Sequence, residues 1–307
     1  MKKLLQPRTT SRTARARGAR PNHGRISRTL AILGFVLAVG GISHAQSILG
    51  STSSYAVMAG STVTINGINT FNGNLGAAGL AGAGTKTFSP SGASVGPVSA
   101  QNQTDFTRAF SGLAAMSGAT DLTGQILGNG VGGISSLTPG VYKFASTAQI
   151  TGVLTLDGQG QTNAVWVFQI GSTLDTAASS SIVMANAGAN SLTNNGLFWQ
   201  VGSTVNFGAD SVFEGNLLVG TSSNLGAGAS IAHGRVLTGT GQTITFGGNS
   251  VNFVGADSGY SGGLVFTGAG NAISAVPEPS SYALVAGFLA LGAILLRRSR
   301  GRAPAIA

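Results

Sequence analysis

Apolar and polar residues alternate in short segments through the middle of this chain, and the segments recur. GSTVNFGADSVFEGNLLV, residues 202–219, is followed directly by GTSSNLGAGASIAHGRVLT, residues 220–238, which repeats its glycine, asparagine and apolar positions about eighteen residues later. FQIGSTLD at 168–175 likewise matches WQVGSTVN at 199–206. Alternation over four to eight residues, bounded by glycine-rich turns, is typical of short β-strands.

The regular spacing of these segments predicts a β-solenoid whose coil has three short strands and three turns. A repeat near eighteen to nineteen residues is too small to bury its apolar side alone, so neighbouring coils must stack to form a core. Stacked coils lie about 4.7–4.9 Å apart in the hydrogen-bonding direction. We therefore expect a mainly β protein in which every coil contributes one layer of apolar side chains.

Alternation also assigns the two sides of each strand. The inward positions form two columns, in which only Ser223 is polar and indicates a locally shifted coil: Leu156, Leu174, Val205, Ser223 and Ile244, then Phe207, Leu225 and Phe246. The outward positions form two files: Thr155, Thr173, Thr204, Ser222 and Thr243, then Asp157, Asp175, Asn206, Asn224 and Thr245. Thr62 and Thr64 in STVTI follow the same pattern, so we expect another coil there.

One segment departs from the strand pattern. Residues 99–117 place Phe106, Phe110 and Leu113 at helical spacing, with Met116 close behind. These residues form one apolar stripe of an amphipathic helix. We expect this helix to lie along the solenoid and to cover one of its sides.

The net charge of +9 is misleading, because the basic residues gather at the two ends of the chain. Between residues 46 and 276 there are four basic and seven acidic residues, which gives that region a net charge of −3. A body of this charge does not favour nucleic acid as a partner. The sequence therefore predicts no nucleic-acid binding.

The basic N-terminus has the layout of a secretory signal peptide. Its basic region precedes the apolar run LAILGFVLAVGGI and the small residues before Gln46. We expect residues 1–45 to be removed by cleavage after Ala45. The run is short for a membrane-spanning helix, so we interpret it as an export signal.

The C-terminal segment 276–302 has three parts: VPEP, the apolar stretch 282–296 and an arginine-rich end. This arrangement resembles the PEP-CTERM sorting signal of exported Gram-negative bacterial proteins. The resemblance implies that Pro277, Glu278 and Pro279 are recognised by a sorting transpeptidase. It also implies that the apolar helix holds the protein transiently in the inner membrane, before the protein is secreted or retained at the cell surface or in the extracellular matrix.

The residues of the middle region do not favour an enzyme. The chain has no cysteine, and after Gln46 the only histidine is His233, so neither disulfides nor a metal cluster is expected. Asp210 and Glu214 are the one close carboxylate pair. Glu214 aligns with His233, with Arg235 one coil away, which we interpret as a surface ion-pair cluster. The sequence also lacks a nucleophile elbow and a phosphate loop, and we expect no cofactor.

The predicted stacking of Asp157 on Asp175 raises one alternative. Two adjacent carboxylates repel each other and hold hydrated charge on the outward face. They would hold a cation only poorly, because two carboxylates without further oxygen ligands make a weak calcium site. We therefore predict no metal site.

Motifs from ILGSTSSYAVMAGSTVT through LTPGVYKF, AVWVFQIGSTL, LFWQVGSTV and FEGNLLV to HGRVLT resemble the large secreted ice-binding protein family of cold-tolerant microbes. The resemblance covers residues 48–254. It implies a right-handed, three-sided, discontinuous parallel β-helix, in which a long α-helix separates an N-terminal segment from the remaining coils. It also implies that ice adsorbs to one flat face of a monomer.

A flat strand face suits that role, since threonine has few rotamers and the strands repeat in two directions. We expect ice to contact the outward files, with these residues: Thr62, Thr64, Thr155, Thr173, Thr204, Asn206, Ser222, Asn224, Thr243 and Thr245. Threonine is also an ordinary residue of exposed strands. The alternative is a structural or carbohydrate-binding protein of the exopolysaccharide matrix, with which PEP-CTERM tails are associated.

Two further segments lie outside the regular coils. Residues 77–98 are expected to cap one end of the solenoid, and residues 255–275 are expected to form a flexible spacer.

Overall fold

The structure is a computed structural model that describes residues 47–88, 95–252, 259–268 and 270–276, together with 287 and 290–292. The expected signal peptide and the Pro277–Pro279 motif lie outside these residues, as does most of the expected apolar helix 282–296. Within the described part, none of the helices combines the length and apolarity needed to cross a membrane.

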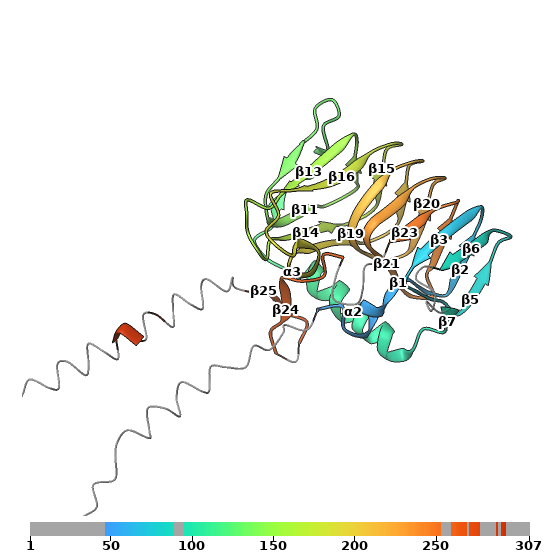
Figure 1. The fold of residues 1–307 in the computed structure, drawn as a ribbon, viewed down its shortest axis with the longest axis horizontal. Helices are drawn as coiled ribbons and strands as arrows, with labels where there is room; N and C mark the ends of the chain where they lie inside the picture. The colour runs from blue at the N-terminus through green and yellow to red at the C-terminus, as the bar shows by residue number, and fades with distance from the viewer. Residues whose placement is uncertain are drawn as a thin grey trace, which may run out of the picture. The chain divides into compact units, whose positions relative to one another are not determined.

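Parallel strands stack in successive coils and make three faces (Figure 1). The eight-stranded face consists of β9 (Ile126–Leu127), β12 (Ala148–Ile150), β15 (Leu174–Thr176), β18 (Val205–Phe207), β20 (Ser222–Leu225), β22 (Thr243–Phe246), β2 (Thr62–Ile65) and β5 (Gly79–Ala81), in that order. The helix-covered face consists of β8 (Thr120–Asp121), β11 (Gly140–Phe144), β14 (Val165–Ile170), β17 (Gly196–Val201), the ends of β19 (Val212–Val219) and β21 (Ser230–Thr240), β1 (Tyr55–Gly60), β4 (Asn74–Gly76) and β7 (Val95–Gly96). The third face consists of β10 (Ser136–Leu137), β13 (Val153–Asp157), β16 (Ser181–Ala185), the beginnings of β19 and β21, β23 (Ser250–Asn252), β3 (Ile68–Asn72) and β6 (Thr85–Phe88).

The chain does not follow the stack in sequence order. The first three strands pair with the last coil of the stack, β1 with β21, β2 with β22 and β3 with β23. β4, β5, β6 and β7 then complete that end, and helix α2 (Ala100–Ala114) leads to β8 and β9 at the opposite end. This arrangement confirms the expected discontinuous solenoid. The described parts of the expected cap 77–98 contain the last strands at one end, β5, β6 and β7, whereas the right-handed winding stays a prediction.

Two strands turn the corner between faces without a break. β19 pairs with β16 at Val212 and with β17 from Asn216 onward, so its two halves belong to different faces. The bend falls at Gly215, whose φ of 97° is unfavourable for other residues. A Cβ there would lie 2.5 Å from Cγ of Leu197. Glycine is therefore required where the strand passes from one face to the next.

Side chains of equal register stack inside the coils. Phe168 lies opposite Trp199 in the pairing of β14 with β17, and their rings stack at 3.8 Å with an interplanar angle of 5°. Tyr142 extends this column in the same register on one side, and Phe213, from the third-face half of β19, packs with a tilted ring against Trp199. Both Phe168 and Trp199 are fully buried. The column links three coils through contacts that no single coil could make.

The predicted helix is confirmed and packs against one face. Ser99 caps α2 in a reciprocal pair with Asn102, so the helix begins at Ala100 and ends at Ala114, slightly short of the expected 117. Phe106 and Leu113 are buried in a second apolar cluster, together with residues such as Phe198 from the strands beneath. The strands of this face are consequently buried on both sides, which explains their nearly continuous apolar sequences.

The expected flexible spacer at 255–275 is wrong for its described residues, 259–268 and 270–275. β24 (Leu264–Phe266) and β25 (Ile273–Ala275) pair as an antiparallel hairpin. Leu264 is buried in the cluster beneath α2, and the Arg108 guanidinium lies 3.7 Å from the centre of the Phe266 ring. Composition alone suggested a spacer, but a few apolar residues and one cation–π contact fix the hairpin to the helix. The remaining short elements are η2 (Gly50–Ser54) and α3 (Ser191–Asn194).

Ser223 does not mark a shifted coil. It pairs in register with Val205 on one side and Ile244 on the other. Its side chain points into the core, fully buried, and its hydroxyl has no hydrogen-bond partner in the structure. The polar residue is therefore accommodated at an energetic cost, not by a change of register.

We predict that Trp199→Ala lowers the free energy of unfolding by about 3–5 kcal/mol, because it removes a fully buried ring that packs against Phe168 and Phe213 and leaves a cavity. Chemical denaturation measures the change. Trp199→Phe is the matched variant, since it keeps an aromatic ring in the column and should cost clearly less. A loss below about 1 kcal/mol for the alanine variant would contradict the role of the column.

We further predict that Ser223→Ala raises the free energy of unfolding by about 1 kcal/mol, because the buried hydroxyl loses its hydration without gaining a hydrogen bond. Ser222→Ala, at the adjacent outward position, should change it very little. Both values come from the same denaturation experiment. Destabilisation by Ser223→Ala would show that the hydroxyl is satisfied within the core.

Candidate functional site

The outward side chains of the eight-stranded face form two straight files. Beneath them, the inward residues of the same strands are fully buried, among them Leu174, Val205 and Ile244. The first file contains Thr147, Thr173, Thr204, Ser222, Thr243 and Thr62, and the second file contains Gln149, Asp175, Asn206, Asn224, Thr245 and Thr64. The face therefore presents small polar side chains at strand spacing in two directions.

Backbone pairing fixes the register of the first file. Ser222 lies opposite Thr243, and Thr62 lies beside Thr243 because Val63 pairs with Ile244. Thr173 and Thr204 directly precede paired strand residues, and the Leu174 amide donates to the Thr204 carbonyl at 3.0 Å. The Thr204 hydroxyl lies 3.3 Å from that of Ser222. Hydroxyl groups thus follow one another across six successive coils.

The second file contains a ladder of amide hydrogen bonds. The Asn224 side-chain amide donates to Oδ1 of Asn206 at 3.0 Å, and the Asn206 amide donates to Oδ1 of Asp175 at 2.9 Å. Beyond Asn224 the file continues with Thr245 and Thr64, which lie opposite each other. The predicted extra coil from STVTI is therefore confirmed, and it places Thr62 and Thr64 on this face.

Thr155 is not on this face, and the predicted pairing of Asp157 with Asp175 is wrong. Thr155 belongs to β13 on the third face, where it lies between Ser136 and Val183. The Asp157 carboxylate instead accepts from the Gln159 backbone amide and the Asn186 side chain, both at 3.0 Å. These bonds hold its pKa below the ordinary value. Asp157 closes a turn, so the cation alternative loses its basis.

The error arose from unequal coil lengths. The eighteen-residue step holds from Val205 to Ser223, but Leu174 pairs with Val205, which lies thirty-one residues later. The two TLD segments, eighteen residues apart, therefore lie on different faces. For the same reason Thr147 and Gln149 were missed. STAQI shows the same alternation, and its Ala148 pairs with Leu174.

The predicted ion-pair cluster is only partly correct. Glu214 lies opposite His233, and its carboxylate is 3.0 Å from Nδ1 of the imidazole. The hydrogen bond to Glu214 raises the His233 pKa, while partial burial opposes this shift. Arg235 is not on the surface: it is fully buried and donates to Oδ1 of Asn216. Tyr260 packs at this corner, and burial followed by the Glu214 charge raises its pKa to about 12.

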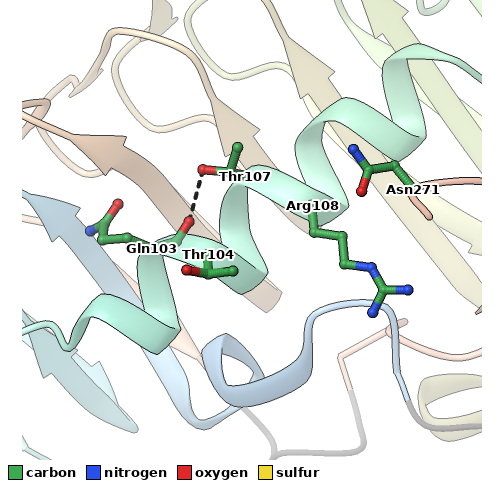
Figure 2. Close-up of a pocket in the computed structure, with 5 residues that line it drawn as sticks. All are labelled: Gln103, Thr104, Thr107, Arg108 and Asn271. Carbon is green, nitrogen blue, oxygen red and sulfur yellow. Dashed lines mark hydrogen bonds between the residues drawn. The ribbon is translucent and has the colours of Figure 1, made fainter. Parts of the chain in front are cut away.

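A shallow groove lies beside α2 (Figure 2). It is lined by Gln103, Thr104, Thr107, Arg108 and Asn271. The Thr107 hydroxyl donates to the Gln103 carbonyl within the helix, and Arg108 donates to the carbonyls of Gly268 and Gly270. The hydrogen bonds of Arg108 hold the hairpin against the helix. Among the described residues, no cluster of three or more histidine, cysteine, aspartate or glutamate side chains could hold a metal ion.

The fold and its regular outward face define this protein as a parallel β-solenoid. Comparison with known proteins identifies its family. The Ice-binding-like family model matches residues 57–252. An ice-binding protein of Nostoc sp. (strain HG1) is 41% identical over 211 residues, which are 67% of this chain and 74% of that protein. The chain therefore belongs to the Ice-binding-like family.

Solved structures agree with this assignment. The ice-binding protein of the Antarctic ascomycete Antarctomyces psychrotrophicus matches with a TM-score of 0.58 and 32% identity, over 66% of this chain and 96% of that one. An ice-binding protein from an Antarctic biological consortium matches with a TM-score of 0.58 and 30% identity, over 67% and 91%. The similarity covers nearly the full length of both solved chains.

We predict that the free energy of unfolding decreases as the pH rises from 6.5, the ordinary pKa of histidine, through the raised pKa of His233. The folded state binds the proton more tightly than the unfolded state, so the stabilisation is complete at low pH and lost at higher pH. Denaturation at several pH values measures this slope. His233→Gln should flatten it, and an unchanged slope in that variant would assign the titration to another group.

Proposed function

We propose that the protein adsorbs to ice through its eight-stranded face and so inhibits ice growth and recrystallisation. The observation that carries this proposal is the regular array of outward threonine, serine and asparagine side chains on a parallel sheet. Such an array repeats about every 6.6–6.8 Å along a strand and about every 4.8 Å between coils. It therefore offers a planar, two-dimensional pattern to an ordered layer of water.

The chemistry of the side chains suits water ordering. A β-branched threonine has few rotamers, so its hydroxyl and methyl groups are held in place before the ligand arrives. The methyl groups cage water while the hydroxyls hydrogen-bond to it. Many weak contacts then add to a lasting attachment, and the ice front between attached molecules must curve. This mechanism requires no catalytic residue, metal or cofactor.

The relatives support the same ligand. The proteins that match most of the chain, from Nostoc and from Antarctomyces psychrotrophicus, are both named ice-binding proteins. The family model spans residues 57–252, which include every strand of the eight-stranded face. We infer that ice is the ligand of this chain as well.

We also propose that the protein acts outside the cell as a monomer. The signal-peptide pattern in residues 1–45 supports export, and the Pro277–Glu278–Pro279 motif supports recognition by a sorting transpeptidase after transient inner-membrane anchoring through 282–296. The final location is then the medium, the cell surface or the extracellular matrix. An extracellular polysaccharide is the alternative partner of the same face.

The test compares one substitution on two faces. Thr243→Tyr places a ring on the proposed ice-binding face, whereas Thr155→Tyr places the same ring on the third face. We expect the purified wild-type chain and Thr155→Tyr to inhibit ice recrystallisation at micromolar concentration. Thr243→Tyr should lose most of this activity, because a protruding ring prevents a flat contact, while keeping its thermal unfolding midpoint.

Two outcomes would contradict the proposal. Equal activity of both variants and wild type would exclude the eight-stranded face as the binding surface. Ice growth unchanged from buffer with all three proteins, together with retention of the wild type on an exopolysaccharide column, would instead support the matrix function.

A further inference from the structure

The second file of the eight-stranded face changes its chemistry partway along the stack. In four successive coils it carries Gln149, Asp175, Asn206 and Asn224, and in the next two it carries Thr245 and Thr64. The first file remains threonine or serine throughout. The face is therefore divided into an end with amide and carboxylate groups and an end with threonine in both files.

Polar side chains at the amide and carboxylate end are hydrogen-bonded to one another. Asn224 donates to Asn206, and Asn206 donates to Asp175, so each bond uses hydrogen-bonding capacity that water would otherwise use. Cross-strand pairs of this kind stabilise a sheet modestly. Asp175 adds a charge, whose hydration shell differs from an ice-like layer. We call Asp175, Asn206 and Asn224 the amide ladder.

Threonines at the other end are exposed or half-buried and have hydroxyl groups that are free to bond to water. Thr62, Thr64, Thr243 and Thr245 form a two-by-two group on β2 and β22, which we call the threonine patch. The hydroxyls of Thr64, Thr243 and Thr245 make no hydrogen bond to any described residue, and that of Thr62 has only a 3.4 Å contact with Ser61. All four hydroxyls can therefore bond to water while their β-branched side chains stay fixed.

We propose that ice binding is concentrated on the threonine patch and that the amide ladder ties coils together at the edge of the contact. This inference rests on the proposed function. The patch joins distant parts of the chain, since Thr64 on β2 lies opposite Thr245 on β22. Docking of the N-terminal strands onto the last coil is thus what completes the binding surface.

The experiment uses two matched double variants in the same file. Thr64→Ala with Thr245→Ala removes half of the patch, and Asn206→Ala with Asn224→Ala removes the ladder bonds. The endpoint concentration for recrystallisation inhibition is measured for the full chain. We expect the patch variant to need on the order of tenfold more protein and the ladder variant a clearly smaller increase, on the order of threefold, because the patch loses hydroxyls that are free to bond to water whereas the ladder amides already bond to one another.

A gain-of-function variant tests the same inference in the opposite direction. Replacing the ladder by threonine, with Asp175→Thr, Asn206→Thr and Asn224→Thr, extends the patch over three more coils. We expect a larger thermal hysteresis than that of the wild type. If the patch double variant unfolds, Thr64→Val with Thr245→Val replaces it, since valine keeps the branched shape and removes only the hydroxyls.

The outcomes separate this inference from the proposed function. An inactive wild type would overturn the proposed function itself. An active wild type with equal losses in the two double variants, or a ladder-to-threonine variant less active than wild type, would overturn only the concentration on the patch. A clearly larger loss in the patch variant than in the ladder variant, with a gain in the ladder-to-threonine variant, supports the inference.

Discussion

In-register parallel pairing between successive coils is the constraint on which the rest of this structure depends. Because each backbone position bonds to its equivalent one coil away, side chains of equal register must stack. Inside, this places Phe168 on Trp199. Outside, it places Asn206 on Asn224 and Thr245 on Thr64. The core and the outward array are therefore two results of one hydrogen-bonding pattern.

The three faces differ in what covers them. α2 and the β24–β25 hairpin bury the helix-covered face through apolar residues such as Phe106 and Leu264. The Gln169 side chain, from a strand of this face, donates to the carbonyls of Leu113 and Met116 and fixes the end of the helix. Within the part of the chain that the structure describes, no helix or hairpin covers the eight-stranded face, and its two outward files contain no apolar stripe. Its regular surface remains available to a ligand that is itself regular.

The discontinuity of the chain has a functional consequence. α2 spans the interval between the two ends of the stack, which allows the first strands to join the coil formed last. The pairing of β2 with β22 then unites threonines that are far apart in sequence. Local folding of either part alone would leave half of the threonine patch. The binding surface is therefore a property of the complete solenoid.

The alternation of apolar and polar residues in the sequence determined many structural features of this protein. It identified the strands, the inward positions, the amphipathic stripe of α2 and the coil that contains Thr62 and Thr64. These features depend on the period of a single strand or helix, which local sequence encodes. The family and its fold were likewise recognisable from motifs spread along the chain.

Only the tertiary structure decided which face each strand joins. Thr155 and Thr173 follow the same local pattern, yet the first lies on the third face and the second lies on the eight-stranded face. Turn lengths between strands vary, so spacing in sequence does not measure a full coil. Burial of Arg235 beside Asn216 and docking of the hairpin by Arg108 also depend on partners distant in sequence. Local alternation determines whether a side chain points into the core or toward solvent, whereas long-range backbone pairing determines which side chains lie next to it.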